Sequence, residues 1–356
     1  MADRLRELRA RIDALDAELL ELINERAACA HEIGQIKEGA FYRPEREAQV
    51  LRRVKDLNGG PLAAETVAIL FREIMSACLA LEKKLSVAFL GPFGTFSEAA
   101  CIKHFGHAAV SVPCGSIDEV FRSAASGGTD YSIVPVENST EGAVGRSLDL
   151  MTQTQLHICG EVVLRIHHHL LSKDSNVALE EIKRVYSHAQ SLAQCHEWLN
   201  LNLPRVERIS VSSNAEAARI AAREAGSAAV AGETAAERYS LHALYRNIED
   251  EPNNTTRFLV LGSHDVGPSG KDKTSLVMSA KNVPGAVHDL LAPFASNGVS
   301  MTKFESRPSR TELWEYVFFV DIEGHVQDPV IAKTIRELKE NVAFLKILGS
   351  YPMAVM

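Results

Sequence analysis

A stripe of apolar side chains runs through the first 36 residues of the chain. Successive members are three or four residues apart, apart from one wider step, which predicts a single amphipathic helix reaching about Lys37. The members are Leu5, Leu8, Ile12, Leu15, Leu19, Leu22, Cys29, Ile33 and Ile36. A helix of about 35 residues spans roughly 50 Å. Because the helical stretch of residues 1–85 cannot by itself cover a helix of that length, we expect an intertwined dimer that buries the stripe against a second copy.

One position of the stripe is charged. After Leu22, where the spacing calls for an apolar residue, the chain carries Arg26. Lys37 lies about three turns further along the helix and faces the same way. A buried guanidinium is costly unless an anion meets it. The helix by itself leaves two readings open: a pocket for an anionic ligand, or an internal ion pair with a glutamate of a neighbouring helix.

Bulk composition narrows the class of protein. With 356 residues, of which 46% are hydrophobic and 24% charged, the chain is expected to form two or three globular domains. A net charge of −8 argues against a nucleic-acid or anionic-membrane surface. No apolar run has the length of a membrane span, and no signal peptide precedes the first helix. Six scattered cysteines without a C-x-x-C pair predict a reduced, cytoplasmic protein.

We expect no metal site and no cofactor. The adjacent histidines His167, His168 and His169 lie in a predicted strand, where neighbouring side chains point to opposite faces and do not converge on one ion. Neither G-x-x-x-x-G-K-[ST] nor G-x-G-x-x-G occurs, which argues against nucleotide binding.

Three stretches of the chain follow different patterns. Residues 1–85 are helical throughout, with further helices predicted over Glu45–Leu57 and Ala63–Leu85. Residues 86–263 alternate short apolar runs with helical patterns, which predicts mainly parallel sheets covered by helices. Residues 264–273 form a polar linker, and residues 274–356 follow the order βαββαβ of a ferredoxin-like domain.

Four loops in the central stretch follow predicted strands. Since ligands of such sheets bind beyond the carboxyl ends of the strands, we expect these loops to meet in one crevice. The loops cover residues 91–97, 137–142, 187–190 and 212–214. Their Ser, Thr, Asn and Gly residues stand at helix starts, where free backbone N–H groups and the helix dipole favour carboxylates. Taken singly, many of these residues are also explained by helix capping alone.

The first stretch resembles the all-helical chorismate mutases. The motifs are Leu8-Arg9-x-Arg11-Ile12-Asp13-x-Leu15-Asp16, Glu25-Arg26, Gly34-x-x-Lys37 and Arg43-Pro44-x-Arg46-Glu47. That family rearranges chorismate to prephenate without a covalent intermediate, by placing cations and donors around a dicarboxylate. The resemblance implies that Arg26 holds one carboxylate and Arg9 of a second subunit the other. It also implies that Lys37 serves the ether oxygen, Glu47 binds the ring hydroxyl and Arg46 supports the loop.

Two positions depart from the best-known bacterial pattern of that family. Cys78 stands where a serine is usual, and Glu82 stands where a glutamine amide donates to the ether oxygen. Because an ionised carboxylate cannot donate a hydrogen bond, we expect Glu82 to work only when it is protonated. Mutase activity should then fall as the pH rises.

The central stretch resembles prephenate dehydratase. The motifs are Gly91-Pro92-x-Gly94-Thr95-x-Ser97, Val134-Pro135-Val136-Glu137-Asn138-Ser139-x-x-Gly142, Tyr186-Ser187-His188-x-Gln190 and Asn254-Thr255-Thr256-Arg257-Phe258. The resemblance implies a two-lobed fold like that of periplasmic binding proteins, with Thr256 as the key catalytic residue. We expect the Thr256 hydroxyl to donate to the departing oxygen and Glu137 to be the proton source. The remaining substrate-binding candidates are Thr95, Ser97, Asn138, Ser139, Ser187, Gln190 and Arg257.

The third stretch resembles the ACT regulatory domain that binds phenylalanine. Two motifs carry the resemblance, Pro284-Gly285-Ala286-Val287 after the first strand and Glu305-Ser306-Arg307-Pro308 at the end of the second. Taken singly, the first motif is also explained as a turn. The second is also explained as charged residues and a proline that keep an edge strand from pairing with another chain. The glycine permits close backbone approach to an amino-acid ligand. The resemblance implies feedback inhibition by L-phenylalanine bound at these residues.

Together the resemblances imply a multidomain, bifunctional chorismate mutase and prephenate dehydratase of phenylalanine biosynthesis. Its expected ligands are chorismate, prephenate and L-phenylalanine, and it is expected to form a homodimer or a higher homo-oligomer. Two alternatives remain: an amino-acid-sensing binding protein, and a dehydratase whose helical segment is only a degenerate dimerisation arm, given Cys78 and Glu82.

Overall fold

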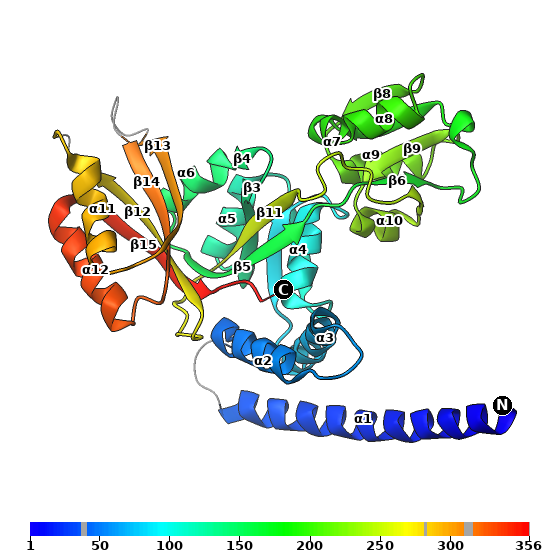
Figure 1. Cartoon of the computed structure of the whole chain (residues 1–356), viewed down its shortest axis with the longest axis horizontal. Helices are drawn as coiled ribbons and strands as arrows, with labels where there is room; N and C mark the ends of the chain where they lie inside the picture. Colours follow the sequence, from blue (N-terminus) through cyan, green and yellow to red (C-terminus); the bar gives the residue numbers. More distant parts are fainter. Residues whose placement is uncertain (37–40, 281–282, 310–315, 356) are drawn as a thin grey trace.

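The computed structural model describes residues 1–36, 41–280, 283–309 and 316–355. Figure 1 shows a helical segment below two α/β lobes, with the C-terminal sheet and its helices beside the first lobe. All-helical, two-lobed α/β and α+β parts follow one another along the chain, as the sequence predicts. Within the described ranges, no helix combines the length and apolarity needed to cross a bilayer.

The helical segment consists of one long helix and two shorter ones. They are α1 (Ala2–Ile36), α2 (Pro44–Leu57) and α3 (Ala64–Glu82). None of the residues of α1 is buried, and its stripe of Leu and Ile side chains lies open to solvent. In this single chain α1 packs along α3 and lies away from both lobes (Figure 1). The structure therefore leaves uncovered the apolar face for which the sequence predicts a second copy.

Helix α2 joins the helical segment to the rest of the molecule. Its Leu51 is fully buried. The Arg52 guanidinium donates to the carbonyl oxygens of Ser269, Lys271 and Met353 and to the Ser269 hydroxyl, over 2.8–3.2 Å. The predicted linker is therefore a packed connection, held by a side chain that satisfies several backbone acceptors at once.

The first lobe contains a six-stranded sheet in the order β2-β1-β3-β11-β5, with β4 paired to β3. Its strands are β1 (Ser86–Leu90), β2 (Val110–Cys114), β3 (Tyr131–Asn138), β4 (Gly142–Ala143), β5 (His157–Arg165) and β11 (Thr255–Gly262). Its helices are α4 (Phe96–Phe105), α5 (Ile117–Ala125) and α6 (Gly145–Gln153).

The second lobe contains a five-stranded sheet in the order β10-β6-β9-β7-β8. Its strands are β6 (His169–Ser172), β7 (Arg184–His188), β8 (Glu207–Val211), β9 (Ser227–Ala231) and β10 (His242–Tyr245). Its helices are α7 (Ala189–Gln194), α8 (His196–Asn202), α9 (Asn214–Ala221) and α10 (Glu233–Tyr239), with a 3₁₀ turn at Leu179–Glu181.

Both sheets are mixed, so the prediction of mainly parallel sheets was wrong. Strand β1 is parallel to β2 and β3, and β7 is parallel to β8 and β9. Strand β11, however, is antiparallel to β3 and β5, while β6 is antiparallel to β9 and β10. The cause is topological, because the chain leaves the first lobe after β5 and returns to it in β11. The two crossing segments, residues 166–168 and 246–254, form the hinge between the lobes.

The C-terminal segment has the predicted βαββαβ order. Its elements are β12 (Asp272–Ala280), α11 (Ala286–Ser296), β13 (Met301–Pro308), β14 (Tyr316–Glu323), α12 (Pro329–Asn341) and β15 (Val342–Pro352). The strands form one antiparallel sheet in the order β13-β14-β12-β15, the ferredoxin-like arrangement. Helices α11 and α12 cover one face, packing against Leu276, Met278 and Val320.

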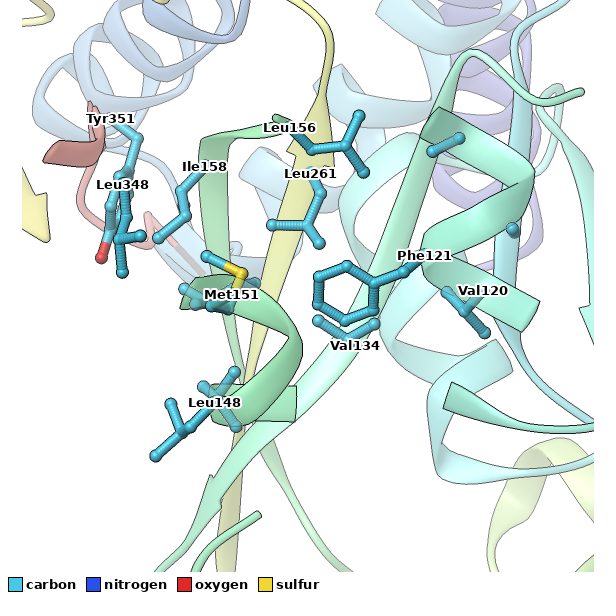
Figure 2. Packing of buried hydrophobic residues seen from close by; sticks show 14 of the residues in the cluster. Val120, Phe121, Val134, Leu148, Met151, Leu156, Ile158, Leu261, Leu348 and Tyr351 are labelled. Atoms are coloured by element: carbon cyan, nitrogen blue, oxygen red, sulfur yellow. The ribbon is translucent and has the colours of Figure 1, made fainter. Parts of the chain in front are cut away.

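The other face of this sheet packs on the first lobe. Alternate residues of the same strands, including Val277 and Phe319, share a core with Val134 and Met151 of the first lobe. Figure 2 shows Leu348 and Tyr351 of β15 beside Ile158 and Met151. Since side chains alternate across a strand, β12 is buried on both faces over Thr274–Met278.

Gly349 marks a close approach between β15 and β5. A Cβ atom at Gly349 would lie 2.4 Å from the carbonyl oxygen of Ile158 and 2.8 Å from its nitrogen. We therefore expect Gly349→Ala to lower the free energy of unfolding by roughly 1–3 kcal/mol through overpacking. Urea unfolding followed by circular dichroism measures this loss. Gly59→Ala, with open space around the new methyl group, is the matched control, and equal midpoints for the two variants would contradict the prediction.

Candidate active sites

A cleft of about 780 Å³ separates the two lobes at the hinge. Residues from all four predicted loops line it, together with residues of the hinge itself. The expectation that these loops meet beyond the strand ends is therefore confirmed.

Three helices begin at the wall of this cleft. The side chains of Thr95, Ser213 and His188 cap α4, α9 and α7, accepting from the backbone N–H groups of Glu98, Glu216 and Gln190. The remaining N–H groups and the positive ends of the helix dipoles favour bound carboxylates. Among the lining residues, all of which belong to the described part of the chain, none is Asp, Glu, Lys or Arg. An anion bound in the cleft therefore meets backbone dipoles and neutral hydrogen-bond donors rather than fixed charges.

Thr256 is held by a polar network at the cleft wall. Asn138 Nδ2 donates to Thr256 Oγ1 over 2.8 Å and to Asn254 Oδ1 over 2.9 Å. Because Thr256 Oγ1 already accepts from Asn138, its own hydroxyl hydrogen remains available to a ligand.

Five of the predicted residues line the cleft, and four do not. The lining residues are Thr95, Ser97, Asn138, Gln190 and Thr256. Ser187 is fully buried and donates to Asn214 Oδ1 and to the Val230 carbonyl, so its hydroxyl is occupied within the second lobe. Ser139 supports a turn, where its hydroxyl accepts from the Thr255 N–H over 2.9 Å.

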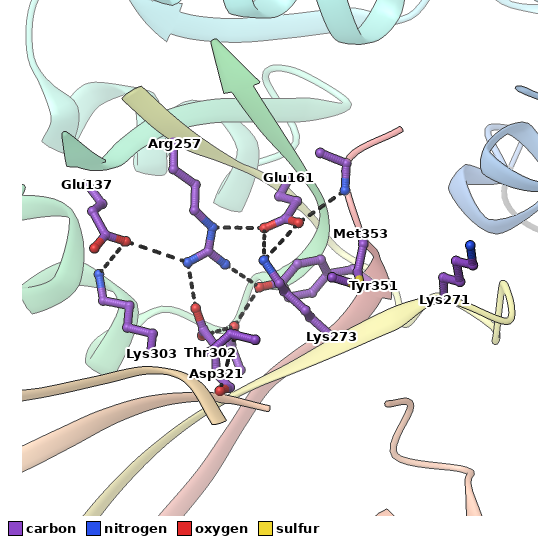
Figure 3. A network of polar contacts seen from close by, with 12 residues as sticks. Glu137, Glu161, Arg257, Lys271, Lys273, Thr302, Lys303, Asp321, Tyr351 and Met353 are labelled. Atoms are coloured by element: carbon purple, nitrogen blue, oxygen red, sulfur yellow. Dashed lines mark hydrogen bonds and ion pairs between the residues drawn. The ribbon is translucent and has the colours of Figure 1, made fainter. Parts of the chain in front are cut away.

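Glu137 and Arg257 face the opposite side of the first sheet, toward the C-terminal segment (Figure 3). Lys303 Nζ of β13 lies 3.1 Å from Glu137 Oε2. Arg257 pairs with Glu161 over 2.8 Å and with Asp321 over 2.5 Å. A proton-source role for Glu137 and a substrate-binding role for Arg257 do not agree with this placement. Strand alternation is the reason, because Thr256 and Arg257 are neighbours and must point to opposite faces.

The Arg257 site is a buried ionic network that joins two segments. Tyr351 Oη accepts from Arg257 Nη2 over 2.9 Å, and Lys273 Nζ lies 3.0 Å from Glu161 Oε2. Burial by itself lowers the pKa of Arg257, but Tyr351, Asp321 and Glu161 outweigh it and raise that pKa well above its usual value. The charge of Arg257 is thus fixed by acceptors from β5, β14 and β15.

Sequence reasoning missed two cleft residues, His168 and Gln194. His168 Nε2 lies 2.9 Å from Gln194 Oε1, and both residues line the cleft. Gln194 follows Gln190 by four residues on α7, so helical spacing could have found it. His168 was considered only as a metal ligand, and no group of side chains in the described ranges is arranged to hold a metal ion.

In the helical segment the structure brings Arg26, Cys78 and Glu82 together between α1 and α3. Arg26 Nη1 lies 3.1 Å from Cys78 Sγ. Glu82 lies against the backbone of α1 at Gly34, where a Cβ atom would come within 2.5 Å of its carboxylate. Glu82 Oε2 is buried and has no hydrogen-bond partner among the described residues.

The other predicted mutase residues lie elsewhere or outside the described residues. Arg9 is 17 residues before Arg26 on α1, about 26 Å along the axis, so both cannot serve one pocket of a single chain. Lys37 lies outside the described residues. Arg46 is exposed.

Glu47 pairs with Arg72, which lies on another face of α3 than Cys78. Its carboxylate is 2.9 Å from Arg72 Nε, and Arg72 lies about 120° around α3 from Cys78. Burial raises the pKa of Glu47, and Arg72 partly offsets that effect. A contact between Glu47 and the ring hydroxyl of a substrate stays a prediction.

The two motifs of the C-terminal segment lie at the same end of its sheet. Val317 is paired with Ser279 on one side and with Arg307 on the other. Ser279 leads toward Gly285 and the start of α11, which carries Ala286 and Val287. Glu305, Ser306 and Pro308 flank Arg307 on β13. Gly285 has a φ of +83°, which favours glycine. Arg307 also contacts Asp149 of α6 over 3.2 Å.

Comparisons with known proteins agree with this organisation. Three family models match in order: chorismate mutase type II over residues 8–83, prephenate dehydratase over residues 87–266 and the ACT domain over residues 274–340. The fold and the two groups of polar residues thus define a multidomain protein of the dehydratase class, with a helical mutase segment before it and a regulatory segment after it.

The chain belongs to the family of bifunctional chorismate mutase/prephenate dehydratases. It is 59% identical to the protein of that description from Neisseria gonorrhoeae, over 97% of this chain and 96% of the relative. It is 54% identical to the one from Pseudomonas aeruginosa, over 99% of each. Among solved structures, a prephenate dehydratase from Arthrobacter aurescens in complex with L-Phe is similar, with a TM-score of 0.69 and 32% identity over 75% of this chain and 90% of that one.

Proposed function

We propose that the chain catalyses two consecutive reactions, the rearrangement of chorismate to prephenate and the conversion of prephenate to phenylpyruvate. One observation carries the second activity: Thr256 stands in a cleft of suitable size with its hydroxyl oriented by Asn138. In that reaction carbon dioxide and the ring hydroxyl leave together as the ring becomes aromatic. Thr256 donates a hydrogen bond to the departing oxygen, and helix N-termini hold the carboxylates.

The first activity belongs to the pocket between α1 and α3, completed by a second copy of the chain. Arg26 binds one carboxylate of chorismate, and Arg9 of the second copy binds the other. Two facts support a dimer: the exposed apolar stripe of α1, and the distance along α1 between the two arginines. Lys37 completes the cation set in this proposal, and Glu82 donates to the ether oxygen in its protonated form.

The C-terminal segment is proposed to bind L-phenylalanine and to inhibit the dehydratase. The route is the buried network around Arg257, the residue that follows Thr256 on β11. Its partners Asp321 and Tyr351 belong to the C-terminal sheet. A ligand that shifts this sheet therefore acts on the strand that carries Thr256.

These activities place the protein in phenylalanine biosynthesis. All six cysteines are free thiols, five of them buried. Free thiols are typical of the reducing cytoplasm, which supports a cytoplasmic location for the protein.

Thr256→Ala tests the dehydratase assignment. We expect the variant to lose about 10²–10³-fold in dehydratase kcat and to keep its mutase activity. Loss of chorismate and formation of phenylpyruvate are followed in one cuvette. Thr255→Ala is the matched control, because the Thr255 hydroxyl donates to the Asn253 carbonyl outside the cleft. Substantial dehydratase turnover by Thr256→Ala would argue against the assignment, and failure of the wild type to consume chorismate would leave the helical segment as a dimerisation arm.

Glu82→Gln tests the proposed donor of the mutase site. The wild-type kcat/KM for chorismate should fall as the pH rises, by up to about tenfold per pH unit, because only the protonated carboxyl can donate. The glutamine amide donates at every pH, so the variant should show a flat profile between about pH 5 and 9. A flat wild-type profile over the same range would contradict the proposal.

Feedback inhibition is tested with L-phenylalanine at millimolar concentration. We expect a lower dehydratase rate and an unchanged mutase rate. Asp321→Asn removes one anionic partner of Arg257 and should weaken the inhibition. Dehydratase kinetics that L-phenylalanine leaves unaltered in the wild type would rule out this regulation.

A further inference from the structure

The reaction proposed for the cleft consumes one proton. Prephenate carries two carboxylates, whereas phenylpyruvate carries one, and the other products are carbon dioxide and water. The electrons of the bond to the lost carboxylate enter the ring, and the electrons of the C–O bond leave with the hydroxyl. That hydroxyl becomes water only if a proton reaches it. A donor within the cleft is therefore required.

Few groups of the cleft can supply that proton. Its lining residues include three titratable side chains, Cys114, His168 and His188. Burial raises the pKa of Cys114, which makes that thiol a poorer acid. The carboxylate predicted for this task, Glu137, faces Lys303 on the far side of the sheet. The choice therefore falls between two histidines.

Backbone donors fix the orientation of the Asn138 amide. Asn138 Oδ1 lies 3.0 Å from the Thr140 nitrogen and 3.1 Å from the Glu141 nitrogen. Since a backbone N–H only donates, Oδ1 must be the oxygen and Nδ2 the nitrogen. Nδ2 then donates to Asn254 Oδ1.

The same reasoning fixes the proton on His168. With Asn254 Oδ1 accepting, Asn254 Nδ2 donates to Gln194 Oε1 over 3.0 Å. Gln194 Oε1 is therefore an acceptor, so His168 Nε2, which is 2.9 Å away, must carry a hydrogen. In the neutral ring, Nδ1 then carries the lone pair. A chain of four side chains, starting at backbone N–H groups, thus selects one tautomer.

His168 Nδ1 is the unused atom of this network. It is buried and has no hydrogen-bond partner among the described residues, although the side chain belongs to the cleft wall. A buried polar atom without a partner costs about 1–3 kcal/mol. The ring hydroxyl of prephenate supplies the missing partner in either state, because a hydroxyl donates to Nδ1 of the neutral ring and accepts from Nδ1–H of the imidazolium.

We infer that His168 is the proton donor of the dehydratase reaction, with Nδ1 bound to the ring hydroxyl of prephenate. The inference rests on the proposed dehydratase activity. In the step, the Nδ1–H bond breaks, the proton passes to the departing oxygen and water leaves as carbon dioxide is lost. The neutral ring regains its proton from solvent before the next turnover, so each cycle consumes one proton.

The surroundings of His168 suit a donor whose protonation is favoured by bound substrate. Glu249 of the hinge accepts the His168 backbone N–H and favours the imidazolium, while His167 opposes it. Helix α7 contributes the neutral Gln194, and α4 contributes the Phe96 ring, 5.5 Å away between ring centroids. Burial lowers the pKa of His168 in the free protein. In a cleft without fixed charges, the substrate dianion is what favours protonation.

Two variants separate the histidines. His168→Gln provides an amide N–H for Gln194 and removes the group at Nδ1. His188→Asn provides an oxygen that caps Gln190, as His188 Nδ1 does now, and removes Nε2. The full-length variants are assayed with prephenate from pH 5 to 9, and their turnover of chorismate is the internal control for folding.

The wild-type dehydratase kcat/KM should fall about tenfold per pH unit at high pH, as the free donor loses its proton. His168→Gln should lose about 10²-fold or more in kcat at low pH and lose this dependence on pH, while His188→Asn, whatever its rate, retains the dependence on pH. A merely structural role would lower the rate equally at every pH and retain the profile, which would overturn the inference. So would a His168→Gln rate within threefold of the wild type. A wild type without dehydratase activity would instead refute the proposed function.

Discussion

A buried guanidinium joins the C-terminal segment to the first lobe of the dehydratase segment. Arg257 belongs to the first lobe, yet its charge is balanced by Asp321 and the Tyr351 hydroxyl of the C-terminal sheet as well as by Glu161 of its own sheet. Removing one member would leave uncompensated buried charge, a cost of about 3–5 kcal/mol. The ion pairs therefore hold the C-terminal sheet against the first lobe. The shared hydrophobic core around Met151 and Leu348 holds the two together as well.

The sequence predicted the three folds and their order because each pattern has its own period. The helix α1 and the βαββαβ order were confirmed, as was the meeting of four loops at one cleft. The mixed character of the two sheets was missed, since strand direction depends on where the chain crosses between lobes. The double burial of β12 left little signal, because only Leu276, Val277 and Met278 form an apolar run within that strand.

The motifs identified residues close to the cleft, but not the face of the sheet to which each side chain points. Thr256 and Arg257 are adjacent in one motif, and so are Glu137 and Asn138. Backbone alternation sends one member of each pair to the cleft and the other to the C-terminal sheet. The tautomer of His168 depends on a relay of amides from two lobes and the hinge. No spacing rule contains that information, because it arises only when distant segments are folded together.

The uncovered stripe of α1 has a consequence for how the two proposed activities respond to dilution. The central cleft is formed by one chain, whereas the mutase site, as proposed, takes Arg9 from a second chain. By mass action, lowering the protein concentration dissociates the dimer while each chain stays folded. At sufficient dilution the mutase would fade while the dehydratase persisted, so the ratio of the two rates is a measure of the dimer population. Subunit association would then determine how much prephenate the protein makes for itself.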